Sequence, residues 1–289
     1  MIDIATLEAR VEALVALPAS EPLPNDARAV VDTLLSALEA GAVRAAQRDD
    51  SGTWRAVPWV KRGILLGFRV GQMTDMSVVG TMGDKGAMFS FFDKDTFPLR
   101  ALELKDGVRV VLGGSVIRRG AYVARGVVCM PPMYVNVGAH VGTGTMIDSH
   151  ALVGSCAQIG ERVHLSAAAQ VGGVLEPVNA SPVVIEDDVI VGGNCGIYEG
   201  TVVRERAVVG AGVVLTRGTP VFDLVREEIY RSTADAPLVI PAGAVVVPGA
   251  RQVAGTWGKG QNLSLQTPII VKYRDDKTDA ATALEEWLR

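Results

Sequence analysis

Residues 133–172 decide the fold, and they read MYVNVGAHVGTGTMIDSHALVGSCAQIGERVHLSAAAQVG. Branched or long aliphatic residues occupy every sixth position of this stretch, at Val135, Val141, Ile147, Val153, Ile159, Leu165 and Val171. The position two residues before each of them is mostly small, and glycine directly follows four of the seven. A short, fixed period of this kind is the signature of a solenoid, in which each repeat stacks on its neighbours.

The six-residue period extends in both directions from this stretch. It runs back through Cys129, Val123 and Ile117 and, after breaks at 173–182 and 216–238, resumes at Ile185, Val191, Ile197, Val203, Val209 and Leu215 and at Ile240 and Val246. One short strand and one tight turn per hexad give a triangular coil, and successive coils stack about 4.8 Å apart. We therefore expect a mainly β fold, a left-handed parallel β-helix over residues 107–249, which is an exception to right-handed crossovers. A β-sandwich is disfavoured, because its strands repeat at about 8–12 residues.

The two ends of the chain do not show the six-residue period. Apolar residues at helical spacing predict helices near 7–15 and 30–38, and we expect residues 54–69 to end in a short strand. Residues 1–106 are thus predicted to form an N-terminal α/β domain. For residues 250–289 we expect a small β/α piece, with a hairpin near GKGQN (258–262), a strand at PIIVKYR (268–274) and a closing helix at 278–288.

Composition excludes several classes of protein. The 289 residues are 48% hydrophobic and carry a net charge of −4, so the chain is neither disordered nor a general nucleic-acid binder. The three cysteines form no CxxC pair, which disfavours a thiolate zinc site and favours a reducing compartment. No run of 18 apolar residues and no signal-peptide pattern occur, so we expect a cytoplasmic protein without a membrane partner.

A histidine metal site is also disfavoured. His140, His150 and His164 are 10 and 14 residues apart, and neither spacing is a multiple of six. The three residues therefore occupy different phases of the repeat and cannot stack in one column to hold zinc. We expect no metal. The sequence leaves two interpretations open for His150 and His164, a turn or surface residue and a general base.

Two carboxylates break the hexad pattern, Asp148 after Ile147 and Glu199 two residues after Ile197. Either could be a solvated corner residue, but a carboxylate is also what acyl transfer to an amine requires, because the ammonium must lose a proton. Their hexads are seven or eight apart, which is not a multiple of three, so we expect them on different faces of the prism. If both serve one site, they must come from neighbouring subunits.

The stretch TMIDSHALVGSCAQIGERVHLSAAAQVGGVLEPVNASPVVIEDDVIVGGN (145–194), with YEG at 198–200, resembles the tetrahydrodipicolinate N-succinyltransferase family. The likeness extends upstream through LEAGAVRAA (38–46), WVKRGILLGFR (59–69), FFDK (91–94), DGVRVV (106–111) and GAYVARG (120–126). The resemblance implies a homotrimer with sites between subunits. It also implies transfer of a succinyl group from succinyl-CoA, a co-substrate and not a bound cofactor, to the amine of L-2-amino-6-oxopimelate. This is a step of the diaminopimelate route to lysine.

The resemblance also assigns roles to residues. It implies that Asp148 binds the substrate near its amine, that Glu199 is the second catalytic carboxylate and that Arg109 contacts the substrate. A guanidinium suits a dicarboxylate, although a structural ion pair is the alternative for Arg109. Ser166 is a candidate substrate contact. Lys259 is a candidate for the CoA phosphates, with a solvated hairpin lysine as the equal alternative.

Other functions stay open on sequence alone. Acetyl-CoA could be the donor for the same acceptor, or the β-helix could be a non-catalytic scaffold. Alanines replace the family's frequent glycine pair in LSAAAQ (165–170), which predicts a tighter acyl pocket. The segment 221–243 is longer than in the usual member of the family, so CoA contacts there are not carried over.

Overall fold

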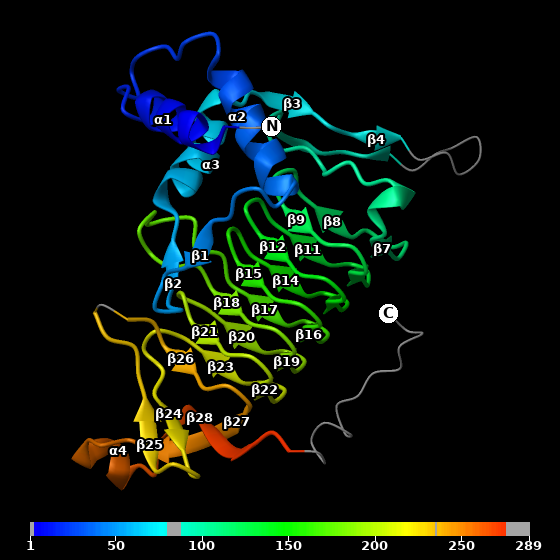
Figure 1. The fold of residues 1–289 in the computed structure, drawn as a ribbon. Coiled ribbons are helices and arrows are strands. Elements are labelled where there is room, and N and C mark those ends of the chain that lie inside the picture. Colours follow the sequence, from blue (N-terminus) through cyan, green and yellow to red (C-terminus); the bar gives the residue numbers. More distant parts are fainter. Residues whose placement is uncertain (1–2, 80–87, 235, 276–289) are drawn as a thin grey trace.

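A computed structural model describes residues 3–79, 88–234 and 236–275 (Figure 1). Helices gather at one end, a stack of short strands forms the middle, and a small sheet with a short helix closes the other end. None of the helices in the described ranges is long and apolar enough to cross a membrane. The fold is the left-handed β-helix that the six-residue period predicts.

Three helices form the core of the N-terminal part: α1 (Ile4–Val15), α2 (Ala27–Glu39) and α3 (Pro58–Val70). The expectation of a strand at the end of residues 54–69 was wrong, because only β2 (Trp54–Ala56) is extended and the rest is α3. Proline in the first turn starts this helix, and its apolar residues face α1 and α2 at helical spacing. A Cβ on Gly63 would lie 2.3 Å from Leu34, so glycine permits close helix packing there.

Short strands complete the N-terminal part. β1 (Ala46–Arg48) pairs with β2, β3 (Met73–Asp75) with β6 (Phe92–Lys94), and β4 (Val78–Val79) with β5 (Met88–Phe89). A 3-10 turn (Leu104–Asp106) then leads into the β-helix.

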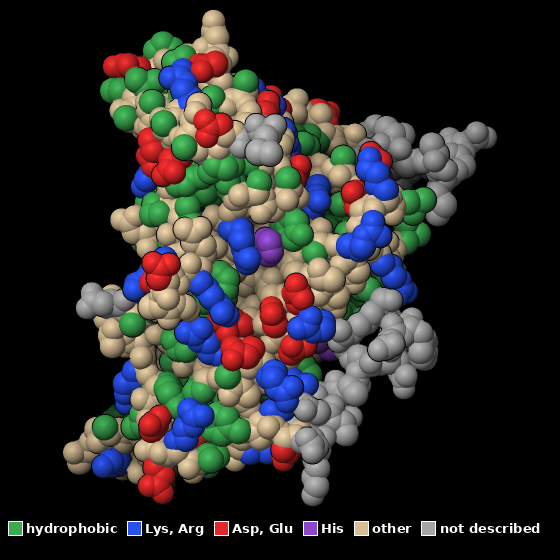
Figure 2. All heavy atoms as spheres, viewed as in Figure 1, with side chains coloured by type: hydrophobic (Ala, Val, Ile, Leu, Met, Phe, Trp, Pro, Cys, Tyr) green, Lys and Arg blue, Asp and Glu red, His purple; other side chains and the backbone are tan. Residues whose placement is uncertain are grey.

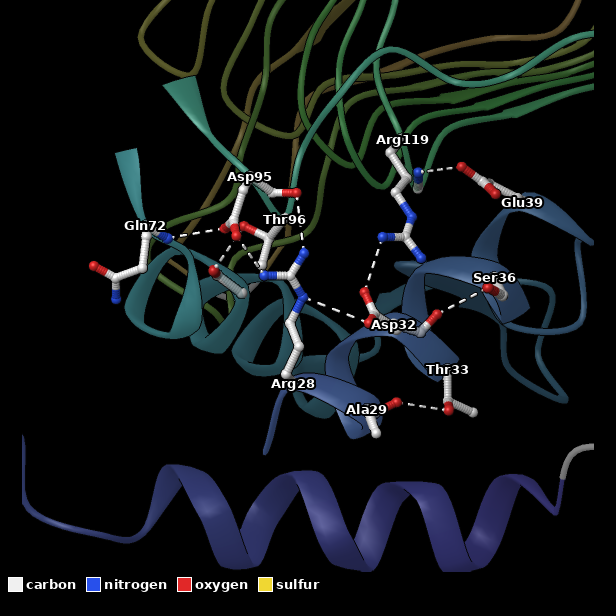
Figure 3. Close-up of polar contacts among 12 residues, drawn as sticks. Arg28, Ala29, Asp32, Thr33, Ser36, Glu39, Gln72, Asp95, Thr96 and Arg119 are labelled. Atoms are coloured by element: carbon white, nitrogen blue, oxygen red, sulfur yellow. Dashed lines mark hydrogen bonds and ion pairs between the residues drawn. The ribbon is translucent and has the colours of Figure 1, made fainter. Parts of the chain in front are cut away.

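Polar contacts of α2 join the helical part to the first coil of the β-helix (Figure 3). Asp32 lies between two guanidiniums, 2.8 Å from Arg119 and 3.5 Å from Arg28. The Glu39 carboxylate accepts a hydrogen bond from the backbone of Gly120 at 2.9 Å. These contacts fix the orientation of α2 on the end of the prism.

The prism has three faces, each a parallel sheet of two-residue strands in its central part. The first face contains β7 (Arg109–Val110), β10 (Val128–Cys129), β13 (Met146–Ile147), β16 (His164–Leu165), β19 (Ile190–Val191) and β22 (Val208–Val209). The second contains β8 (Val116–Ile117), β11 (Tyr134–Val135), β14 (Leu152–Val153), β17 (Gln170–Val171), β20 (Gly196–Ile197) and β23 (Val214–Leu215). The third contains β9 (Tyr122–Val123), β12 (His140–Val141), β15 (Gln158–Ile159), β18 (Val184–Ile185), β21 (Val202–Val203) and β26 (Val239–Ile240).

The sixth-position aliphatics fill the axis of the prism, as predicted. From Val135 to Leu215 every residue of this register is at most 1% exposed. The backbone turns in the left-handed region three residues after each of them, except after Val171 and Leu215, which precede the two breaks; φ is +64° at His150, +66° at Cys156 and +74° at Gly138. The glycines that directly follow an aliphatic have another cause. A Cβ on Gly142 would lie 2.5 Å from the backbone of Gly160 in the next coil, so these glycines permit stacking.

The last strands of the described chain form a hairpin, as the sequence predicts. β27 (Ala244–Gln252) continues the first face and pairs antiparallel with β28 (Ser264–Tyr273), and the connection holds the short helix α4 (Thr256–Gly260). The break at 216–238 contains β24 (Val221–Asp223) and β25 (Glu228–Tyr230), which extend the same sheet. The closing helix expected at 278–288 lies outside the described residues.

Candidate active site

Asp148 and Glu199 lie at different corners of the prism. Asp148 follows β13 and turns from the first face to the second, whereas Glu199 follows β20 and turns from the second face to the third. Their strands are seven apart along the chain, and Glu199 lies two coils further along the axis than Asp148. The expectation that the two carboxylates occupy different faces is confirmed, and both corners border the second face.

Asp148 stands beside residues of the next coil. Its backbone N–H donates to the carbonyl oxygen of Leu165 at 2.9 Å, and its Oδ1 accepts from the backbone of Ser149 at 2.7 Å. His164 Nε2 lies 3.9 Å from Asp148 Oδ2. Ser166 directly follows Leu165, so it occupies the same corner one coil later. The structure thus brings Asp148, His164 and Ser166 together, with a third of the Asp148 side chain exposed.

Arg109 lies on the same face as Asp148, two strands earlier. It is in register with Val128 and, through it, with Met146. Two strand spacings, about 9.6 Å, separate Arg109 from Met146, and Asp148 is two residues beyond Met146. The Arg109 side chain is exposed. An exposed guanidinium on the face that leads to the Asp148 corner suits a carboxylate of an amino dicarboxylate.

Glu199 has an unusual backbone. At the other corners the left-handed residue stands three positions after the aliphatic, but here both Glu199 (φ +53°) and Gly200 (φ +75°) are left-handed. Among the described residues, Glu199 is the one non-glycine at a prism corner with a positive φ two positions after the aliphatic. Seven other non-glycine corner residues of the prism are also left-handed, so the position of Glu199 in its turn is unusual and the sign of its φ is not.

A cavity of about 290 Å³ lies beside Glu199. The loop of residues 173–182 contributes Ser181 to its lining, the segment after β23 contributes Arg217, and the N-terminal part contributes Arg55. Glu199 Oε2 accepts a hydrogen bond from the backbone N–H of Arg217 at 2.6 Å. Arg217 was not among the site residues predicted from the sequence. The signal was that the hexad period stops at Leu215, two residues before it.

Lys259 is far along the chain from the corner residues and belongs to α4, beyond the last coil (Figure 1). It is exposed, and its backbone N–H donates to Gly255. The three histidines do not converge: His140 is on the third face, His164 on the first, and His150 at the corner after β13. The described chain therefore groups its site residues around two corners, with Lys259 apart from them.

Comparisons with known proteins agree with this architecture. Residues 6–70 match the family model "Tetrahydrodipicolinate N-succinyltransferase N-terminal", and residues 182–217 match "Hexapeptide repeat of succinyl-transferase". A 2,3,4,5-tetrahydropyridine-2,6-dicarboxylate N-succinyltransferase of Polynucleobacter asymbioticus is 41% identical over 273 residues, which are 93% of this chain and 92% of that protein. Proteins of the same name from Paramagnetospirillum magneticum and Acinetobacter baylyi are each 40% identical, and each match covers 92% of this chain and 91% of the relative.

Proposed function

This chain belongs to the tetrahydrodipicolinate N-succinyltransferase family, and we propose that its Asp148 and Glu199 serve one active site built between neighbouring copies of the chain. The reaction is transfer of the succinyl group of succinyl-CoA to the acceptor amine in the diaminopimelate route to lysine. The observation that carries the proposal is the position of the two carboxylates at separate corners of one prism. Within a single copy they cannot face the same reacting atoms.

A threefold ring of copies resolves this separation. If the second face of each prism turns toward the axis, the prism edge that carries Asp148 in one copy lies beside the edge that carries Glu199 in the next, with the two carboxylates offset by two coils along the prism. Half-buried apolar side chains on the outside of the second face support such an interface, among them Val116, Leu152 and Val214. We infer that the enzyme is a homotrimer with three equivalent sites.

The chemistry assigns a role to each group. The acceptor enters as an ammonium ion and gives one proton to a corner carboxylate. The amine nitrogen then forms a bond to the thioester carbonyl carbon, the carbon–sulfur bond breaks, and the CoA thiolate leaves and takes up a proton. Asp148 holds the amine with Ser166 beside it, Arg109 binds a carboxylate of the acceptor, and Glu199 approaches from the adjacent copy. Lys259 is the candidate contact for the CoA phosphates.

Mixing two inactive variants tests the shared site. Asp148→Asn and Glu199→Gln homotrimers should each release little CoA from succinyl-CoA and the acceptor. After subunit exchange, mixed trimers contain sites in which both carboxylates are intact, so part of the activity should return. If exchange is proven with differently tagged chains and no activity returns, the carboxylates do not share a site. Parallel assays with acetyl-CoA measure donor preference.

A further inference from the structure

The third corner of the prism, between the third and first faces, borders a cavity that the acyl-transfer site does not use. Its volume is about 470 Å³. One wall is the third face with the turns that follow it, and the other is formed by the β1–β2 hairpin and the residues before it, which contribute Arg44, Arg48 and Trp54. Figure 2 shows basic side chains and a histidine meeting in the middle of this side of the molecule, with acidic side chains nearby. Asp148 and Glu199 belong to the other two corners.

Arg44 is the unusual group in this cavity. Its Nε donates to Gln158 Oε1 at 2.9 Å, and its guanidinium carbon lies 5.5 Å from the centre of the Trp54 ring. Within the described ranges its two terminal nitrogens donate no hydrogen bond to the protein and no carboxylate lies in salt-bridge contact with them. Burial lowers the pKa of Arg44, although Tyr122 and Asp187 favour its charged form. A largely covered guanidinium normally has an anionic partner.

Glu186 and Arg48, beside Arg44, already have partners. Glu186 is 3% exposed, and its Oε1 is 2.8 Å from Arg48 and 2.9 Å from Arg204. The same oxygen accepts a hydrogen bond from Trp54 Nε1 at 2.8 Å. This cluster fixes the Trp54 ring beside Arg44. It leaves Arg44 as the cation that can bind an incoming anion.

The rest of the cavity lining suits a small ligand that carries one negatively and one positively charged group. Tyr122 and His140 stack with ring centres 4.3 Å apart. Burial and the charge of Arg44 lower the pKa of His140 to about 3, so the ring is neutral at physiological pH. Asp187 lines the same cavity and is exposed, and its Oδ1 accepts only the backbone N–H of Glu161 in the described chain. A cation and a carboxylate thus border one space.

From this arrangement we propose that the cavity is a binding site for a free α-amino acid, with its carboxylate on Arg44 and its ammonium toward Asp187. A guanidinium fork binds a carboxylate in bidentate geometry. The flat rings of Trp54, Tyr122 and His140 provide apolar surface for the body of the ligand. The cavity volume falls in the range of small-molecule sites, roughly 300–1,000 Å³.

Isothermal titration tests the proposal with L-lysine, L-phenylalanine and glycine as amino acid probes and succinate and phosphate as anions without an ammonium group. The protein is the full-length Asp148→Asn variant, so that binding at the acyl-transfer site is weakened. At least one amino acid should bind saturably with a Kd below about 1 mM, and Arg44→Gln and Asp187→Asn should each weaken it about tenfold or more. Glu161→Gln, at the same rim, should change the affinity little, because Glu161 pairs with Arg162.

A second variant keeps the test decisive if Arg44→Gln does not fold. Gln47 is exposed on β1 and lines the cavity, so Gln47→Trp should fill its mouth and abolish binding without touching the core. The absence of saturable binding by every amino acid probe would overturn the proposal. So would equal affinity for succinate or phosphate, or binding that Gln47→Trp leaves intact.

Discussion

Lys61 Nζ lies 2.6 Å from the carbonyl oxygen of Ala180 and 3.5 Å from that of Pro177. Lys61 belongs to α3 and is fully buried, and desolvation lowers its pKa. Its partners belong to the loop 173–182 that interrupts the β-helix. The next residue of that loop, Ser181, lies against the Glu199 corner, since a Cβ on Gly200 would be 2.7 Å from its carbonyl oxygen. A buried lysine of the helical part therefore fixes the loop that borders the Glu199 cavity.

We expect Lys61→Met to lower both stability and turnover. The methionine fills similar space but leaves the carbonyl oxygen of Ala180 without its donor, at a cost of about 1–3 kcal/mol. The loosened loop should also disturb the Glu199 corner. Urea unfolding and steady-state CoA release measure the two effects. Lys94→Met is the matched control, because Lys94 donates to the carbonyl oxygen of Gly71, away from this loop. Equal losses of stability and turnover in the two variants would show that Lys61 does not hold the loop 173–182 in place.

Asp148 and Ile147 are adjacent in sequence but should have opposite mutational effects. Asp148→Asn keeps the Oδ1 acceptor for Ser149 and lies outside the core, so its stability should stay within about 0.5 kcal/mol of the parent while turnover falls at least roughly 100-fold. Ile147→Ala opens a cavity on the axis and should cost about 2–5 kcal/mol. Thermal unfolding and CoA release separate the two. Full turnover by Asp148→Asn would remove its proposed role.

The three cysteines should be inert in the native protein. All are free and buried, and desolvation raises the pKa of Cys129 and Cys156 to about 12 and also raises that of Cys195. The thiolate is the reactive species, so Ellman's reagent at pH 8 should find almost no reactive thiol until denaturant is added and then three per chain. Fast reaction of a native thiol would mean that the prism opens locally.

Glu186 should make stability fall in acid. Burial opposes its ionisation, but hydrogen bonds from Glu205 and Trp54 and the charges of Arg204 and Arg48 outweigh it, so its pKa lies below the usual value. A lowered carboxylate pKa stabilises the fold above the unfolded-state pKa of about 4.3, and this contribution is lost as pH falls through the folded-state pKa. The free energy of unfolding should therefore decrease below about pH 4.3.

Glu186→Gln tests this pH dependence. The variant should lose about 1–3 kcal/mol at neutral pH, because Arg48 and Arg204 lose their shared anion, and its acid slope should be shallower. Glu161→Gln is the control on an exposed pair with Arg162, and it should change stability by less than about 1 kcal/mol. Parallel acid profiles of parent and Glu186→Gln would show that Glu186 does not cause the slope.

The sequence was sufficient for the prism because its period is set by burial. One aliphatic residue per face, such as Ile159, must point into the axis, so the six-residue spacing of aliphatic residues predicts the fold. The same spacing placed Asp148 and Glu199 at different corners. The six-residue spacing gave no guidance for α3, because the apolar residues of this helix pack against other helices and do not follow that period.

The contacts between distant segments were not predictable in this way. Lys61 with Ala180, Arg217 with Glu199, and Arg44 with Gln158 each join positions whose separation follows no period. Their partners depend on where the two irregular loops and the β1–β2 hairpin fold back on the prism. The left-handed backbone of Glu199 could not be predicted either, because at other corners the left-handed residue stands three positions after the aliphatic and Glu199 stands two positions after it.

In the β-helix, six residues of sequence advance the chain by one face and eighteen residues advance it by one complete coil. Deleting one hexad between Asp148 and Glu199 would turn every later corner by one face, whereas deleting eighteen residues would keep the corners aligned and shorten the axial offset by about 4.8 Å. A deletion between the two carboxylates should therefore keep their relative corners only when it removes whole coils. The loop at 173–182 escapes this rule because it bulges outward, so its length can vary while the register of the coils on either side stays fixed.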